Sequence, residues 1–176
     1  FPKDVQALAK SGEEYGYHFG ILESVMSINE KQKTIIVPKI KGYFNNDLKG
    51  KKIAIWGLAF KPDTDDIREA PALYIIEELL AAGAEITAFD PEAMSNVKAL
   101  LGDKIKFALS KDEAAEGADA LVIATEWQIF RTPDFKKLAK QMNQKVIFDG
   151  RNLYDLEDVK ESGFYYSSIG RELVSN

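Results

Sequence analysis

From Lys52 onward the chain alternates short runs of apolar and β-branched residues with amphipathic segments, and this alternation constrains the fold more than any other feature. The runs typical of strands are 52–56, 85–89, 120–124 and 145–148, with weaker candidates at 106–108 and 165–168. The segments typical of helices are 72–82, 91–101, 111–116 and 134–142. Strands that alternate with helices favour a parallel sheet, because each parallel connection needs a crossover. We therefore predict an α/β, Rossmann-like doubly wound parallel sheet with helices on both faces.

A second pattern precedes this alternation. Over Tyr17–Phe44 the apolar residues recur at helical spacing, which predicts a long helix. Pro38 lacks an amide hydrogen, so the helix should kink or break close to it. An apolar stripe of this length would be unusual on a monomer, so we expect a second copy of the chain to cover it. The expected parts are a helical dimerisation segment over 1–46 and a Rossmann-like domain over 47–176.

The charge balance excludes several kinds of partner. The chain has 28 Asp and Glu residues against 23 Lys and Arg, for a formal net charge of −5. Nucleic acids and anionic membranes are bound by clustered Lys and Arg, so neither is expected as a partner. No apolar run reaches the roughly 18 residues of a membrane span, and no leader is evident, so we expect a cytoplasmic protein. The chain has no cysteine and a single histidine, so no metal site is expected.

The longest connection of the predicted domain follows its first strand. It has the sequence GLAFKPDTDDIREAP at 57–71, whereas such connections usually take about two to six residues. Ligands of doubly wound sheets bind beyond the carboxyl ends of the strands, so a long loop there indicates function. The loop lacks the GxGxxG pattern of dinucleotide sites. Lys61 and Arg68 are suited to phosphate, although on residues alone it is equally plausible that they only balance the carboxylates of the loop.

Polar residues also follow the other strands. In the sequence DGRN at 149–152, Arg151 is a second candidate for binding an anion, although a solvated arginine after an Asp-Gly turn is slightly favoured on residues alone. Asp90 lies where a ribose-binding acid often occurs, but Asp-Pro is also a common start of a helix, and we favour that interpretation. The sequence TEW at 125–127 either lines the site or covers the core through Trp127.

Four segments together resemble the UDP-glucose/GDP-mannose dehydrogenase family, most closely its UDP-glucose 6-dehydrogenase members. They are FPKDVQAL at 1–8, VMSINEKQK at 25–33, the loop at 57–71 and DGRNLY at 149–154. The first is similar to the stretch that directly follows the family's catalytic cysteine, and the second to its central helix. The third is similar to the hallmark of the UDP-binding domain, and the fourth to its closing motif. The resemblance implies that the cysteine and an amino-terminal NAD domain lie outside this chain.

The implied activity is the oxidation of UDP-glucose to UDP-glucuronate for polysaccharide biosynthesis, with two hydride transfers to NAD+ through a cysteine thioester. The chain alone is then expected to be inactive, because it has neither the cysteine nor the NAD domain. UDP-N-acetylmannosamine and GDP-mannose dehydrogenases are alternatives within the family. An alternative of another class is a dimeric module that binds UDP without catalysis.

The resemblance also implies roles for single residues. The implied catalytic acid is Asp4, near the missing cysteine. The implied contacts of NAD are Lys3 and Arg68. The implied contacts of the sugar nucleotide are Phe60, Lys61 and Arg151. The implied partners are UDP-glucose, held by its UDP moiety, and a second copy of the chain, held through the Tyr17–Phe44 helix.

Overall fold

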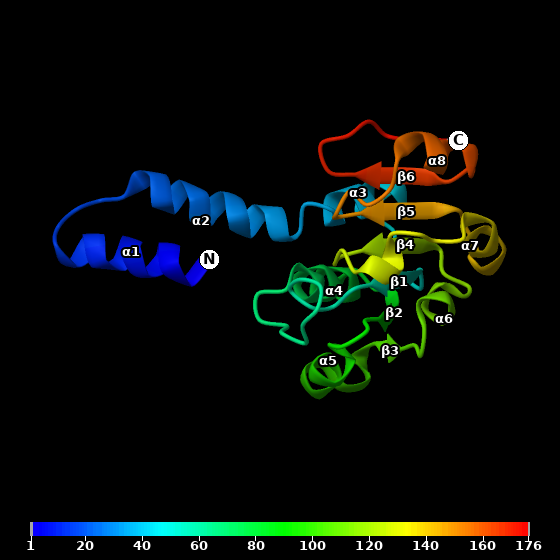
Figure 1. Cartoon of the computed structure of the whole chain (residues 1–176), viewed down its shortest axis with the longest axis horizontal. Helices are drawn as coiled ribbons and strands as arrows, with labels where there is room; N and C mark the ends of the chain where they lie inside the picture. The colour runs from blue at the N-terminus through cyan, green and yellow to red at the C-terminus, as the bar shows by residue number, and fades with distance from the viewer. Residues whose placement is uncertain (1, 176) are drawn as a thin grey trace. The chain divides into compact units, whose positions relative to one another are not determined.

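The structure of the chain is a computed structural model that describes residues 2–175 and, within them, the side chains from residue 4 onward. It comprises two compact units, Phe1–Thr34 and Ile35–Asn176, each of which is described by itself (Figure 1). Among the described residues, no helix is both long enough and apolar enough to span a bilayer. The functional division at residue 46 remains a prediction.

The first unit is a pair of helices, α1 (Pro2–Glu14) and α2 (Gly20–Lys33) (Figure 1). Helix α1 was not predicted. The helix predicted over Tyr17–Phe44 is divided into α2 and α3 (Val37–Tyr43), which confirms the expected break near Pro38. Pro38 lies in the first turn of α3, where its missing amide hydrogen would have no helical partner, so the interruption falls just before it.

Helix α3 corrects the extent of the predicted dimer surface. It belongs to the second unit, and its apolar residues are buried in the core of that unit. Ile36, Val37 and Ile40 are at most 1% exposed. The apolar pattern over 35–44 therefore packs within the chain, because it covers the sheet next to it, and only the part on α2 stays available to a second copy.

The second unit is built on a six-stranded sheet with the order β3-β2-β1-β4-β5-β6. The strands are β1 (Lys52–Trp56), β2 (Glu85–Phe89), β3 (Lys106–Phe107), β4 (Ala120–Ile123), β5 (Val146–Asp149) and β6 (Tyr165–Ser168). Every neighbouring pair is parallel. This confirms the predicted doubly wound sheet. Strand order reverses between β1 and β4, and such a switch point is where ligands of these folds bind.

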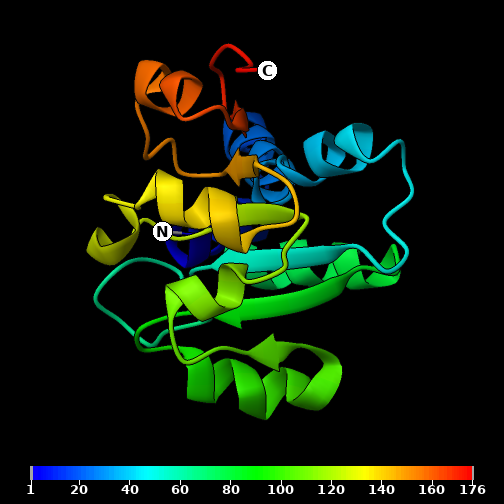
Figure 2. The same cartoon turned by 90° about the vertical axis from the view of Figure 1, so that its right-hand side faces the viewer.

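Helices cover both faces of the sheet (Figures 1 and 2). In Figure 2, α6 and α7 lie in front of the strands and α4 lies behind them. The helices that follow α3 are α4 (Pro71–Ala81), α5 (Met94–Leu101), α6 (Lys111–Ala115), α7 (Phe135–Gln141) and α8 (Leu156–Glu161). Helix α8 was not predicted, and α5 begins three residues later than expected.

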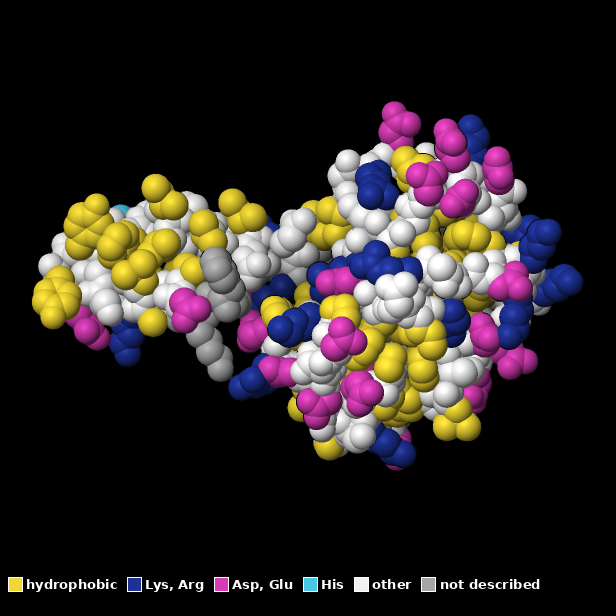
Figure 3. Space-filling model, viewed as in Figure 1, with side chains coloured by type: hydrophobic (Ala, Val, Ile, Leu, Met, Phe, Trp, Pro, Cys, Tyr) yellow, Lys and Arg dark blue, Asp and Glu magenta, His cyan; other side chains and the backbone are white. Residues whose placement is uncertain are grey.

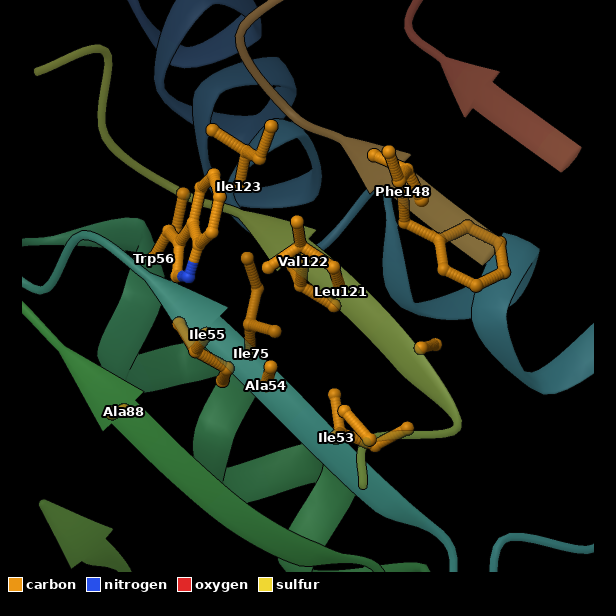
Figure 4. Packing of buried hydrophobic residues seen from close by; sticks show 14 of the residues in the cluster. Ile53, Ala54, Ile55, Trp56, Ile75, Ala88, Leu121, Val122, Ile123 and Phe148 are labelled. Atoms are coloured by element: carbon orange, nitrogen blue, oxygen red, sulfur yellow. The ribbon is translucent and has the colours of Figure 1, made fainter. Parts of the chain in front are cut away.

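The core lies on both faces of the central strands. Strands β4 and β5 are buried at every position, as is β1 after its first residue, so their apolar runs are continuous rather than alternating (Figure 4). Trp56, the last residue of β1, stacks on Phe130 with ring centroids 5.2 Å apart. Its indole nitrogen donates to the Lys111 carbonyl at 2.9 Å. The carboxyl ends of β1, β4 and β5 therefore present their loops at one rigid edge.

Candidate functional site

The loop after β1 begins with a close approach between two backbones. Gly57 has a φ of 94°, and a Cβ atom at this position would lie 2.5 Å from Cβ of Thr125 in the loop after β4. Thr125 is fully buried, and its hydroxyl donates to the Ala59 carbonyl at 2.6 Å. The two loops are thus packed together before either reaches solvent.

Beyond Ala59 the loop emerges and turns back on itself. The Phe60 amide donates to the Asp66 carbonyl at 2.8 Å, which closes the segment between them. Phe60 is 40% exposed, and Lys61 is also exposed. Within the described part of the chain, Lys61 has no ion-pair partner, so its ammonium group is open to an anionic ligand. The role of Lys61 in binding a ligand stays a prediction.

Arg68 is held differently. Its Nε and Nη2 donate to the Asp66 carboxylate at 2.9 and 2.6 Å, and its side chain is 73% exposed. The hydrogen bonds that Arg68 donates to Asp66, together with the carboxylate's charge, raise the pKa of Arg68 above its ordinary value. Arg68 lies three residues before α4, which begins at Pro71 as the helix-start preference of proline predicts. It lines an open cavity of about 560 Å³ together with Asn96 of α5.

Asp90, at the end of β2, is fully engaged by the protein. Its carboxylate is 1% exposed. It accepts hydrogen bonds from the amides of Leu58, Ala59, Glu92 and Ala93 and from the Trp127 indole, at 2.6–3.0 Å. These donors occupy the carboxylate lone pairs that would have to accept a hydrogen bond from a ribose hydroxyl. Asp90 therefore ties the loops after β1, β2 and β4 together. It does not cap the predicted helix, because α5 begins later, at Met94, with Ala93 as its N-cap residue.

The loop after β5 is organised by a second buried carboxylate. Asp149 accepts hydrogen bonds from the Arg151 and Leu153 amides, both at 2.7 Å, and from the Tyr166 hydroxyl at 2.8 Å. Burial, reinforced by the Asp149 charge, raises the pKa of Tyr166 well above its ordinary value. The importance of Asp149 was missed, since its partner Tyr166 comes from β6 and no local signal announces it.

Arg151 is fixed at one end of its guanidinium group. Nε donates to the Ala124 carbonyl at 2.7 Å and lies 3.1 Å from Oε2 of Glu126. Neither Nη group has a hydrogen-bond partner within residues 2–175. The side chain is 27% exposed, so the free Nη groups form a fork that is both oriented and reachable.

The second unit therefore brings three predicted site residues, Phe60, Lys61 and Arg151, to the same edge of the sheet. Two others belong to the first unit. Asp4 lies exposed in the first turn of α1, and the Lys3 side chain falls outside the described residues. The catalytic and NAD roles of these two residues stay predictions. Within the described residues, no cluster of His, Asp and Glu is arranged to hold a metal ion.

A doubly wound parallel sheet, with an exposed lysine in the loop after β1 and an arginine held by its Nε in the loop after β5, places the chain in the class of nucleotide-binding α/β domains. Residues 54–156 match the UDP binding domain of the UDP-glucose/GDP-mannose dehydrogenase family. The chain belongs to this family, which confirms the resemblance drawn from its motifs.

Individual relatives agree with this assignment. The UDP-glucose 6-dehydrogenase of Pseudomonas aeruginosa is 44% identical over 176 residues, which cover 97% of this chain and 39% of that protein. The UDP-glucose 6-dehydrogenase TuaD of Bacillus subtilis is 41% identical over 174 residues, with coverages of 99% and 38%. The chain thus spans about two-fifths of the length of these relatives.

Solved structures show the same fold. A UDP-glucose dehydrogenase from the archaeon Pyrobaculum islandicum superposes with a TM-score of 0.79 and 30% identity, over 90% of this chain and 35% of that one. A UDP-D-ManNAc dehydrogenase from Pyrococcus horikoshii gives a TM-score of 0.78 and 30% identity, over 97% and 37%.

Proposed function

We propose that this chain is the UDP-binding part of an NAD-dependent UDP-glucose 6-dehydrogenase, and that Lys61 and Arg151 receive the diphosphate of the sugar nucleotide. The observation that carries the proposal is the Arg151 guanidinium. Its Nε is held by the Ala124 carbonyl, while neither Nη group has a hydrogen-bond partner among the described residues. A planar fork of this kind matches phosphate oxygens in two places at once. Lys61 adds a point charge from the loop after β1, and Phe60 adds an exposed ring.

UDP-glucose is the favoured substrate of the whole protein, because the sequence relatives at 41–44% identity are named for it. The similarity to a UDP-D-ManNAc dehydrogenase structure makes that sugar nucleotide the second candidate. Both substrates share the UDP moiety, so the edge around Lys61 and Arg151 would serve either one.

We infer that the described residues of this chain do not form a dinucleotide site for NAD by themselves. The loop after β1 lacks the glycine pattern, and the five donors around Asp90 leave no acceptor for a ribose. Contact with NAD would be limited to the exposed Arg68 and, in the first unit, to Lys3. The chain has no cysteine for thioester formation, so we infer that it does not catalyse the oxidation alone.

Lys61→Ala tests the proposed ligand site. A charge-assisted contact contributes roughly 1.5–3 kcal/mol, so the substitution should weaken UDP binding by about tenfold to a hundredfold in titration calorimetry. Lys160→Ala is the matched control, since Lys160 lies exposed in the last turn of α8, away from the carboxyl edge of the sheet. If Lys61→Ala binds UDP as tightly as the unchanged chain, Lys61 is not part of the site.

We also infer that α2 pairs with a second copy of the chain. Ile21, Val25 and Ile28 recur on one face of α2 and are 80%, 45% and 63% exposed. Apolar side chains gather visibly on the two-helix unit (Figure 3). A continuous exposed patch on a helix face marks an interaction surface, because burying it removes apolar area from water.

Val25→Asp should dissociate this dimer. An unpaired charge inside an apolar interface costs on the order of 3 kcal/mol or more, so the dissociation constant should rise at least about a hundredfold. Sedimentation velocity at tens of micromolar measures the change. Ser27→Asp adds the same charge two residues away, on the opposite side of α2, and should leave the dimer intact. A monomeric unchanged chain at this concentration would contradict dimerisation through α2 alone.

A further inference from the structure

Three consecutive residues after β4, Thr125, Glu126 and Trp127, each contact a different part of the site edge. Their partners are, in order, the Ala59 carbonyl at 2.6 Å, Arg151 Nε at 3.1 Å and Asp90 Oδ2 at 3.0 Å. The first and third contacts fix the loop that carries Lys61, either directly or through Asp90. The second contact reaches the other predicted cation. One short segment therefore lies between the two phosphate-binding side chains and contacts the supports of both.

The contact between Glu126 and Arg151 differs from the other two, because it depends on charge. Oε2 of Glu126 is shielded from solvent and accepts no hydrogen bond from the described residues, and its side chain as a whole is 32% exposed. The Nε atom of Arg151 lies next to this oxygen but donates its hydrogen to the Ala124 carbonyl. A shielded carboxylate oxygen needs a compensating cation, and among the described residues Arg151 is the one within ion-pair distance.

Both contacts of the Arg151 guanidinium group are made by its Nε atom. The hydrogen bond to the Ala124 carbonyl fixes the position of Nε. The attraction of the Glu126 carboxylate then restrains rotation of the guanidinium group about Nε. The two Nη groups are then held in one direction before any ligand arrives. Preorganisation of this kind strengthens binding, because the ligand need not order the side chain itself.

We propose that Glu126 is a positioning residue, which acts on UDP only by holding the Arg151 fork toward the diphosphate; this rests on the function proposed above. A carboxylate beside a phosphate site also repels the ligand. If Glu126 were merely a counter-charge, its neutralisation would tighten UDP binding. If it positions Arg151, the same neutralisation weakens binding, so the sign of the effect separates the two roles.

The test is a double-mutant cycle on the full chain, with UDP affinity measured by calorimetry for the unchanged chain, Glu126→Gln, Arg151→Ala and the double variant. Glu126→Gln should weaken UDP binding by about threefold to tenfold, since a charge-dependent contact is lost while the side-chain volume is kept. In the Arg151→Ala background the same change should cause no weakening. Glu85→Gln, at the exposed start of β2 on the opposite edge, controls for the change in net charge.

Two results would overturn the proposal. One is UDP binding by Glu126→Gln that equals or exceeds that of the unchanged chain. The other is an equal loss of affinity in both Arg151 backgrounds, which would mean that Glu126 does not act through Arg151. Thermal unfolding by circular dichroism identifies any variant that has lost its fold.

A second measurement needs no ligand, so it separates failure of this proposal from failure of UDP binding. In the ¹⁵N-labelled chain, the Nε–H signal of Arg151 is assigned by its disappearance in Arg151→Lys. Its exchange with solvent should become faster by about threefold or more in Glu126→Gln, because the restraint on the guanidinium is removed. An unchanged exchange rate would overturn the positioning role, whether or not the chain binds UDP.

Discussion

Asp90→Ala should lower the free energy of unfolding by about 3–5 kcal/mol. The substitution removes a buried carboxylate that accepts five hydrogen bonds, from four backbone amides and the Trp127 indole. A buried donor without an acceptor costs about 1–3 kcal/mol, and water entering the new space recovers only part of the sum. Urea denaturation followed by circular dichroism at two wavelengths gives the value.

The matched control for Asp90→Ala is Asp103→Ala. Asp103 is exposed in the short 3-10 turn after α5, so its removal should change the unfolding free energy by no more than about 0.5 kcal/mol. A loss below about 1 kcal/mol for Asp90→Ala would mean that the loops after β1, β2 and β4 do not depend on this carboxylate.

Tyr154 and Tyr166 together should destabilise the chain at alkaline pH by about 2.7 kcal/mol per pH unit once the pH exceeds roughly 10. Burial is the main cause that raises the pKa values of Tyr154 and Tyr166, and the Asp149 charge adds to it. Unfolded tyrosine loses its proton near pH 10, whereas these two keep theirs in the folded state. The folded state then binds more protons than the unfolded state, so stability falls as pH rises until the raised folded pKa values are passed.

Tyr166→Phe isolates one half of this effect. The phenylalanine has no proton to lose, so the slope above pH 10 should become shallower by about 1.4 kcal/mol per pH unit. Tyr15→Phe is the control, because Tyr15 is 89% exposed and should leave the slope unchanged. Urea titrations at several pH values between neutrality and pH 11 give the slopes. Equal slopes for all three proteins would show that Tyr166 titrates in the folded chain as it does in the unfolded one.

The sheet could be predicted from the sequence because its central strands are buried on both faces. A strand such as Lys52–Trp56 must then be apolar throughout and bounded by turn residues, and both properties are local. Helix α8 escaped prediction because its six residues are too few to show a helical period. Helix α1 was not predicted because its few apolar residues are scattered among charged and small ones.

The sequence predicts which loops carry the candidate site residues, but not the contacts that these residues make with distant parts of the chain. Lys61 and Arg151 follow strands, and their position in the sequence alone places them at the carboxyl edge. The two interpretations of Asp90, by contrast, depend on partners such as Trp127, which is 37 residues away. Arg68 forms the ion pair with Asp66 that is expected if it only balances the carboxylates of the loop. Its contact with NAD stays a prediction.

The contact between Gly57 and Thr125 sets a limit on how this site can be re-engineered. Because a side chain on Gly57 would collide with Thr125, neither position tolerates a larger residue while the neighbouring backbones keep their places. Phe60 and Lys61 have no such restriction, since both side chains are exposed. Libraries that aim at a different nucleotide should therefore vary Phe60 and Lys61 and leave residues 57–59 and 125 unchanged.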